Sequence, residues 1–217
     1  MPKTAAVLGA AAVGAALAAR KAMRDRSAAR LAPWPEQREL PCDDDDAGRP
    51  LAGVRVLELA TVIAAPSVGR CLAELGATVI KVEAPEGDMF RQLFIQMDGN
   101  PTKQAKAHGS MFETHNLSKA SVQLDLKRAE GRAALLAMLA DADVFVVNVR
   151  AAPLRRLGLD YATLSQKLPT LVYAHLTAWG LVGEHRNRAG YDFGSFWAAS
   201  GLAHTLHAGS SPAASAT

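Results

Sequence analysis

The chain has 217 residues, of which 49% are hydrophobic and 21% are charged, as expected for a globular protein with a sizeable core. Its net charge is only +3, and five basic residues lie between Arg20 and Arg30, so the remainder is nearly neutral and lacks the basic surface of a nucleic-acid-binding protein. Cys42 and Cys71 do not have the spacing of metal ligands, which argues against a zinc site and a disulfide framework.

Residues 1–31 differ in composition from the rest of the chain. An apolar, Ala-rich run from Ala5 to Ala19 precedes the basic residues, and Asp25 is the only acid among them. The run is shorter than the roughly 20 residues that cross a bilayer. Its composition favours a transit peptide and a mitochondrial location. The alternatives are a short membrane anchor, an artefact of the gene model and a cytoplasmic protein.

The remainder divides into a linker, a domain and a tail. Residues 32–50 are rich in Pro and Asp and have no apolar periodicity, which predicts a linker. Residues 51–207 alternate between strand-like and helix-like segments, and residues 208–217 are of low complexity. This alternation predicts an α/β fold, with a Rossmann-like, open, mostly parallel sheet and helices on both faces.

The domain begins with a strand, a helix and a second strand. The segments "VRVLELA" (54–60) and "TVIKVE" (78–83) are rich in β-branched residues and Leu. Pro66 suits the first position of the intervening helix, and Gly76 can end it. The predicted apolar face consists of Val68, Cys71, Leu72 and Leu75. Cys71 is therefore expected to be a buried free thiol, and the unit to be a right-handed parallel crossover.

The later elements are predicted from the same patterns. A short helix is expected near Phe90–Met97, within an irregular stretch. Further strands are predicted at 121–126, 144–149 and 170–179, the last two buried. Further helices are predicted at 127–142, where Leu135, Met138 and Leu139 share a face, at 152–159 and at 161–168.

One hypothesis is a dinucleotide site at the first turn. Glu83 ends the second strand, where a carboxylate could bind ribose hydroxyls. The turn "TVIAAPSVG" lacks the glycines that let the backbone approach a pyrophosphate. A dinucleotide-binding α/β domain is therefore only an alternative.

The sequence shows no nucleophile with a paired base. Neither G-x-S-x-G nor H-E-x-x-H occurs, and the six histidines have no metal spacing: His108, His115, His175, His185, His204 and His207. No metal is therefore expected. Asp192 in "RAGYDFGSFW" is the most suggestive acid, although a role as the N-cap of the segment that follows explains it fully and is favoured.

Amide and basic side chains gather at predicted strand ends. Asn116 and Lys119 precede one strand, Asn148 and Arg150 end another, and Arg156 follows on the next turn. Ligands of open parallel sheets bind beyond the carboxyl ends of the strands. Cations there suit a ligand that carries phosphates.

The ordered motifs resemble the class III CoA-transferases, the CaiB–BaiF group, which also includes α-methylacyl-CoA racemases. Four stretches within about residues 50–206 carry the resemblance: "PLAGVRVLELATVIAAPSVGRCLAELGATVIKVEAPEGD", "HNLSKASVQLDLKRAEGRAAL", "ADVFVVNVRAAPLRRLGLDYATLSQKLPTLVYAHLTAWG" and "RAGYD". The resemblance implies transfer of CoA between an acyl-CoA and a carboxylic acid. It implies no covalently bound cofactor and, for the full-length family protein, an interlocked homodimer.

The resemblance also implies a CoA site. Its residues would be Val62, Ile63, Asn116, Lys119, Asn148, Arg150 and Arg156. The first turn would then lie against CoA, so a glycine fingerprint is not required. No membrane partner is expected beyond the N-terminal segment.

The sequence departs from the family pattern at several positions. Ala84 stands where the family often has an Arg that helps hold the nucleotide, and "RAA" replaces R-P-G at Arg150. Tyr191 replaces the catalytic His of the racemases, which favours the transferase branch because tyrosine is a poor base at neutral pH. Tyr191 and Asp192 are left as candidates for a supporting role.

The family's nucleophile is an Asp that lies beyond "GYD" and attacks the thioester to form covalent intermediates. No position of this chain matches that Asp, so we expect the 217-residue chain alone to be inactive. The alternatives are a non-catalytic CoA- or acyl-CoA-binding protein and a racemase-like isomerase.

Overall fold

The computed structural model describes three stretches of the chain, residues 49–93, 110–191 and 193–208. Several predicted features lie outside them: the segment 1–31, nearly all of the linker 32–50 and of the tail 208–217, and Cys42, His108 and Asp192. Among the residues that are described, no helix is both long enough and apolar enough to cross a bilayer. The predictions for the two ends of the chain stay predictions.

The core of the molecule is a parallel sheet of five strands. They are β1 (Arg55–Leu59), β2 (Thr78–Glu83), β3 (Ala120–Gln123), β4 (Val144–Val147) and β5 (Val172–His175), in the order β3-β2-β1-β4-β5. Every pairing is parallel. The predicted α/β fold with an open sheet is confirmed, and the described strands are all parallel rather than mostly parallel.

The strand order reverses beside β1. The chain runs from β1 outward to β2 and β3, and then returns to place β4 on the other side of β1. Neighbouring connections therefore leave the sheet in opposite directions at the carboxyl ends of β1 and β4. In open α/β sheets this topological switch point is where ligands bind.

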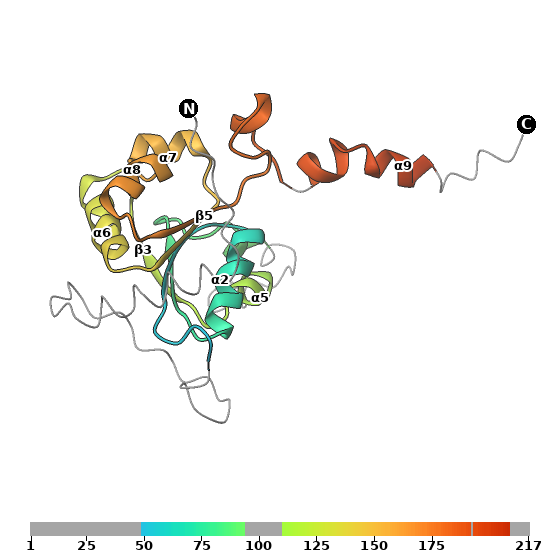
Figure 1. Ribbon diagram of the computed structural model, residues 1–217. Coiled ribbons are helices and arrows are strands. Elements are labelled where there is room, and N and C mark those ends of the chain that lie inside the picture. The colour runs from blue at the N-terminus through green and yellow to red at the C-terminus, as the bar shows by residue number, and fades with distance from the viewer. Residues whose placement is uncertain (1–48, 94–109, 192, 209–217) are drawn as a thin grey trace, which may run out of the picture.

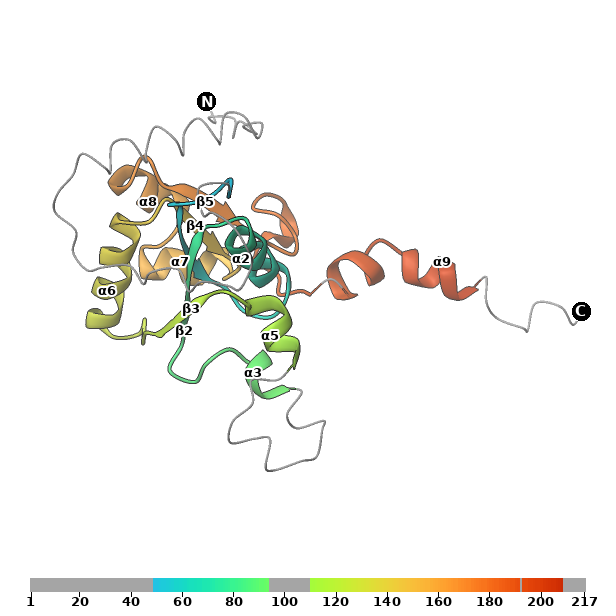
Figure 2. The same ribbon diagram turned by 90° about the horizontal axis from the view of Figure 1, so that it is seen from below.

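Helices cover both faces of the sheet, as predicted. The α-helices are α2 (Ala64–Glu74), α3 (Phe90–Leu93), α5 (Ser110–Asn116), α6 (Ala129–Ala140), α7 (Ala151–Leu157), α8 (Tyr161–Lys167) and α9 (Leu202–Ala208). Figures 1 and 2 show α2 and α5 on one side of the sheet and α6, α7 and α8 on the other. The short helix α5 was not predicted from the sequence.

The face under α6, α7 and α8 holds the larger apolar core. Leu57, Phe145 and Val147 of the sheet pack with Leu135 and Leu139 of α6, and all five side chains are fully buried. The predicted face of α6 is thus confirmed for both leucines, while Met138 packs only partly buried against the cluster. Full burial of each large side chain stabilises the fold by about 2 kcal/mol.

The face under α2 is built differently, and the sequence prediction for this helix was partly wrong. The helix begins at Ala64, so Pro66 lies within its first turn rather than at its first position. Its buried side consists of Ala65, Pro66, Gly69 and Ala73. Cys71 is exposed and Leu75 is 46% exposed.

Close packing over β1 explains this difference. A Cβ atom at Gly69 would lie 1.9 Å from Oε2 of Glu58, so only small residues fit where α2 crosses the strand. Gly76 ends the helix as predicted, since its φ of +100° suits glycine. Its N–H bonds the Ala73 carbonyl, and the N–H of Ala77 bonds the Leu72 carbonyl.

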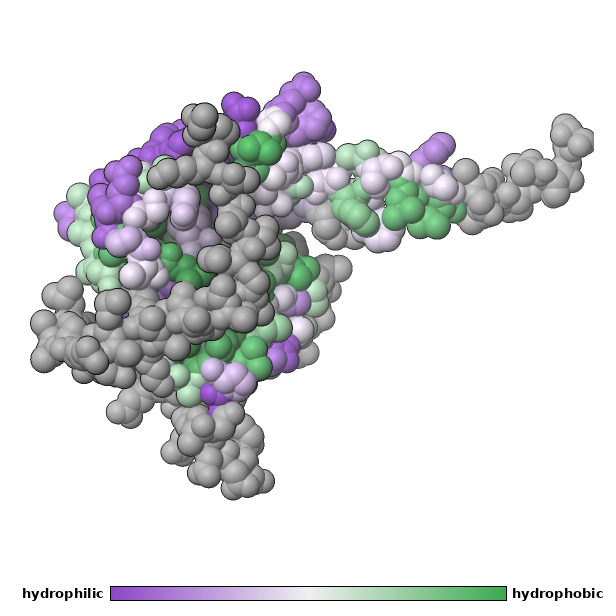
Figure 3. Space-filling view, in the orientation of Figure 1, coloured by the Kyte–Doolittle hydropathy of each residue, from purple (hydrophilic) through white to green (hydrophobic). Residues whose placement is uncertain are grey.

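The last strand and the segments after it lie at the margin of the fold. The strand predicted at 170–179 is confirmed as the shorter β5, but the expectation that it is buried was wrong, since β5 is an edge strand whose residues are half-buried. Beyond it, η2 (Glu184–Asn187) precedes η3 (Phe193–Ala198) and α9, which project from the body (Figure 1). Figure 3 shows hydrophobic surface on this projection, where Phe196 and Leu206 are 55% and 59% exposed.

Candidate functional site

The turn between β1 and α2 lies at the switch point and is bonded to Asn148, which directly follows β4. The side-chain amide of Asn148 donates to the Thr61 carbonyl at 2.8 Å, and its oxygen accepts from the Thr61 N–H at 3.1 Å. Val62 follows with a φ of 72°, a left-handed conformation that costs a β-branched residue about 1–3 kcal/mol. Ile63 comes next and is 39% exposed. The structure therefore brings together the predicted residues Val62, Ile63 and Asn148.

Arg150 and Arg156 lie on α7, which starts just beyond this point. Arg150 is the N-cap residue of α7, two positions after Asn148, and Arg156 is in its last turn. Both residues are exposed. Their positive charges are therefore available to a ligand at the carboxyl edge of the sheet.

Asn116 and Lys119 have a different environment. The Lys119 side chain is 1% exposed, and its Nζ donates to Oε2 of Glu58 at 2.8 Å, to the Pro66 carbonyl at 2.7 Å and to Oδ1 of Asn116 at 3.0 Å. Burial lowers the pKa of Lys119, an effect that Glu58 opposes. Asn116 is also buried and donates to the Phe112 carbonyl. Contact of these two residues with a ligand stays a prediction.

The contacts of Lys119 belong to a larger buried charge network. Lys81 of β2 lies beside Glu58 in the sheet and contacts its Oε1 at 3.2 Å. Its Nζ also contacts Oδ2 of Asp88 at 2.9 Å and donates to the Ala60 carbonyl at 2.7 Å. The side chains of Glu58, Lys81 and Asp88 are at most 1% exposed. Two lysines and two carboxylates therefore balance one another under α2 and α5.

Glu83, the residue of the dinucleotide hypothesis, is already bound within the protein. Its carboxylate accepts from Nε and Nη2 of Arg91, from Oγ of Ser121 and from the N–H of Asp88. Burial opposes ionisation, but these hydrogen bonds and the charge of Arg91 lower the pKa of Glu83 from 4.5 to about 2. Four protein donors leave little capacity for ribose hydroxyls, which weighs against a dinucleotide site.

This carboxylate predicts a pH dependence of stability. Because the pKa of Glu83 is depressed on folding, its contribution is fully present above about pH 4.5 and is lost as the pH falls towards 2. The contribution is up to about 3 kcal/mol. Urea unfolding at a series of pH values should show that the free energy of unfolding falls less between pH 4.5 and 2 in Glu83→Gln than in the wild type. If the free energy of unfolding changed with pH in the same way in both proteins, the contribution assigned to the Glu83 carboxylate would be wrong.

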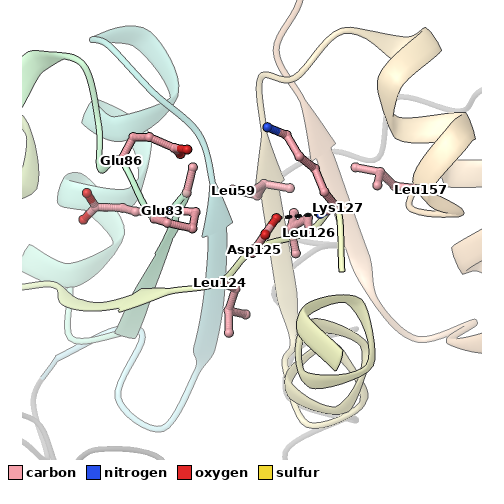
Figure 4. Close-up of a pocket in the computed structure, with 10 residues that line it drawn as sticks. Leu59, Glu83, Glu86, Leu124, Asp125, Leu126, Lys127 and Leu157 are labelled. Atoms are coloured by element: carbon pink, nitrogen blue, oxygen red, sulfur yellow. Dashed lines mark hydrogen bonds between the residues drawn. The ribbon is translucent and has the colours of Figure 1, made fainter. Parts of the chain in front are cut away.

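A pocket of about 270 Å³ opens at the same edge of the sheet. It is lined by Leu59, Glu83, Ala84, Pro85, Glu86, Leu124, Asp125, Leu126, Lys127 and Leu157. Four leucines give it an apolar lining, and Figure 4 shows Glu86 and Lys127 on opposite sides of the gap. Oδ1 of Asp125 accepts from the N–H of Lys127, which fixes the loop after β3. The pocket thus joins an apolar space to one cation, Lys127, and three carboxylates, those of Glu83, Glu86 and Asp125.

Most of the residues that line this pocket were not predicted from the sequence as part of a site. Only Ala84 and Glu83 had been considered, for other reasons, although the strand-end rule applies equally to residues 124–127 after β3. The apolar contribution of Leu157 depends on how α7 folds back, which no local pattern shows. Tyr191 is 61% exposed, and its hydroxyl lies 3.8 Å from the Met89 sulfur. Its supporting role therefore stays a prediction.

The chain is similar to known proteins in both fold and sequence. A crystal structure of a CAIB/BAIF family protein from Brucella suis superposes with a TM-score of 0.63 at 37% identity, covering 70% of this chain and 39% of that one. A cinnamoyl-CoA:phenyllactate CoA-transferase from Clostridium sporogenes is 40% identical over 72% of this chain and 37% of its own length. An (R)-2-hydroxy-4-methylpentanoate CoA-transferase from Clostridioides difficile is 34% identical over 75% of this chain and 40% of its own length.

The chain thus spans well under half the length of these relatives. The family model described as CoA-transferase family III matches residues 51–217, which include every described element of the sheet and its helices. The chain belongs to CoA-transferase family III.

Proposed function

We propose that residues 51–208 form a CoA-binding domain of a CoA-transferase that moves CoA between an acyl-CoA and a carboxylic acid. The observation that carries the proposal is the switch point between β1 and β4. There the turn of Val62 and Ile63 is bonded to Asn148, next to the exposed Arg150 of α7. The relatives named above, which are CoA-transferases, support the same conclusion.

The turn suits CoA better than a dinucleotide. A dinucleotide fingerprint needs bare backbone at this position, whereas this turn presents the side chains of Val62 and Ile63. Such side chains can pack against the flexible apolar parts of a pantetheine arm. Exposed guanidinium groups on α7 can pair with phosphate oxygens, in the bidentate geometry that arginine favours.

The pocket beside β2 and β3 extends this site. Its leucine lining suits a flat aromatic ring, and Lys127 at its margin suits a phosphate. We therefore assign to it the adenosine end of CoA, with the pantetheine arm directed to the β1–α2 turn. Ala84 lines the same pocket, so the charge that the family often supplies there would come from Lys127 in this chain.

The acid partner and the assembly are also proposals. We propose a carboxylic acid acceptor and a homodimer for the full-length protein. The names of the relatives specify phenyllactate and (R)-2-hydroxy-4-methylpentanoate for those proteins alone. The residues of the CoA site are the part of the proposal that this chain can test directly.

Substitution of Arg156 tests the proposed phosphate contact. In calorimetric titrations with free CoA, Arg156→Gln should weaken binding by about tenfold at low salt, since one charge-assisted contact is lost. Binding by the wild type should also weaken as NaCl is raised, because salt screens an exposed ion pair. Arg186→Gln is the matched control, since Arg186 lies in η2 and bonds its own turn.

Two results would contradict the proposal. Equal CoA affinities for Arg156→Gln and Arg186→Gln would exclude Arg156 from the site. Binding of NADH as tight as that of CoA would favour a dinucleotide domain instead.

A further inference from the structure

Residues 60–67 comprise the β1–α2 turn and the first residues of α2, and buried lysines bond this segment near both of its ends. Nζ of Lys81 donates to the Ala60 carbonyl at 2.7 Å, and Nζ of Lys119 donates to the Pro66 carbonyl at 2.7 Å. Both ammonium groups are 1% exposed. A buried ammonium that donates to a backbone carbonyl fixes the position of that carbonyl firmly, because no water is there to replace it.

A single carboxylate couples the two lysines. Glu58 contacts Lys81 through Oε1 and Lys119 through Oε2, and it projects from β1 just before the turn begins. Lys81 lies on β2 and Lys119 immediately precedes β3. The three side chains thus tie the turn to three neighbouring strands of a rigid sheet.

Further contacts hold the turn at its middle and at the start of α2. Asn148 bonds both the N–H and the carbonyl of Thr61. The hydroxyl of Ser67 donates to the Ile63 carbonyl and lies 2.9 Å from Nδ1 of His115. A turn held in this way can keep Val62 at its left-handed φ, which an unsupported valine would leave.

We propose that Lys119, Lys81 and Asn148 are positioning residues, which fix the backbone of the turn so that Val62 and Ile63 meet CoA without rearrangement. Lys119 then acts through the Pro66 carbonyl and does not itself contact the phosphates of the ligand. This inference rests on the proposed CoA site. It separates the predicted site residues into two groups, with Arg150 and Arg156 facing the ligand and Asn116 and Lys119 supporting the turn.

The two roles of a cation differ in their dependence on salt. A cation that pairs with a ligand phosphate makes binding sensitive to ionic strength, whereas a buried cation bonded to backbone does not. Free CoA should be titrated by calorimetry against the wild type, Lys119→Gln and Arg156→Gln at a series of NaCl concentrations. The salt slope is the change in the logarithm of the CoA dissociation constant with the logarithm of the NaCl concentration. We expect Lys119→Gln to weaken binding about fivefold to tenfold with an unchanged salt slope. We expect Arg156→Gln to make this slope shallower.

Amide resonances of the ligand-free proteins give an independent measure of the turn. In Lys119→Gln the amide shifts of residues 60–67 should move, whereas Arg156→Gln should leave them in place. A flattened salt slope in Lys119→Gln, with the amides of the turn unmoved, would overturn the inference and place Lys119 against the phosphates.

Asn148→Ala provides a second variant in case the buried substitution prevents folding. Asn148 is only half-buried, and its loss removes two hydrogen bonds without exposing a buried charge. Asn148→Ala should change the amide chemical shifts of the turn and weaken CoA binding with an unchanged salt slope. Unchanged amide chemical shifts would overturn the inference. If the wild type binds no CoA, the proposed function fails, while the amide shifts still decide whether these side chains hold the turn.

Discussion

Glu58→Gln should destabilise the protein by about 3 kcal/mol or more, because it removes a carboxylate that neutralises two buried lysines. Glu58 is fully buried, and Lys119 makes its described ion pair with it alone. Lys81 keeps its contact with Asp88, so the larger part of the loss should come from Lys119. Urea unfolding at neutral pH, analysed as the change in the free energy of unfolding, measures the effect.

Glu130→Gln is the matched control for this substitution. Glu130 pairs with Arg128 at 3.6 Å, but its side chain is 78% exposed. Solvent screens such a pair, so its loss should change stability by less than about 1 kcal/mol. Similar effects of the two substitutions would show that the buried network does not support the fold.

Gly131→Ala should also destabilise the protein by about 3 kcal/mol, against the intrinsic preference of a helix for alanine. A Cβ atom at Gly131, in the first turn of α6, would lie 2.1 Å from the carbonyl oxygen of Asp125. That oxygen belongs to the backbone and accepts from the N–H of Arg128, so it cannot move aside cheaply. The helix would have to shift away from the loop that carries Lys127 and lines the pocket.

Gly194→Ala provides the comparison. Apart from its chain neighbours and its own helix backbone, no heavy atom in the part of the chain that the structure describes lies within 4 Å of a Cβ built there, so alanine should be neutral or slightly stabilising. Thermal unfolding of both variants gives the two free-energy changes under the same conditions. A neutral Gly131→Ala would mean that α6 and the 125–127 loop are not packed as the structure shows.

The order of the strands and helices could be predicted because local patterns carry it. A segment rich in β-branched residues and Leu at 54–60 and a mostly apolar run at 144–149 indicate strands, and Gly76 marks the end of a helix. Strand pairing followed from a general rule, since a short strand–helix–strand unit is almost always a right-handed parallel crossover. The strand order, and with it the switch point beside β1, was not predicted from the sequence. Asn148 was selected only by the rule that ligands bind beyond the carboxyl ends of parallel strands.

The buried charge network could not be predicted in this way. Glu58 and Lys81 each interrupt an apolar strand, a pattern that equally fits a solvated face. Lys119 lies 61 positions from Glu58, and no pattern in a single sequence connects the two. The same network explains why the face of α2 was mistaken, since Gly69 must pass over Glu58 and the larger residues turn outward.

These features together explain how a turn without glycines can serve a ligand site. In the proposed site its side chains would take the place that bare backbone has in dinucleotide proteins, and the buried lysines and Asn148 would keep its shape. The sheet provides the rigid support, and α7 provides exposed positive charge.

The most direct test of this account is an amide chemical-shift titration of the chain with free CoA. The proposed CoA site predicts chemical-shift perturbations at the carboxyl edge of the sheet, in residues 60–63, 84–88, 124–127 and 148–157. Saturating CoA with no perturbation there, or with shifts confined to the opposite edge of the sheet, would contradict it.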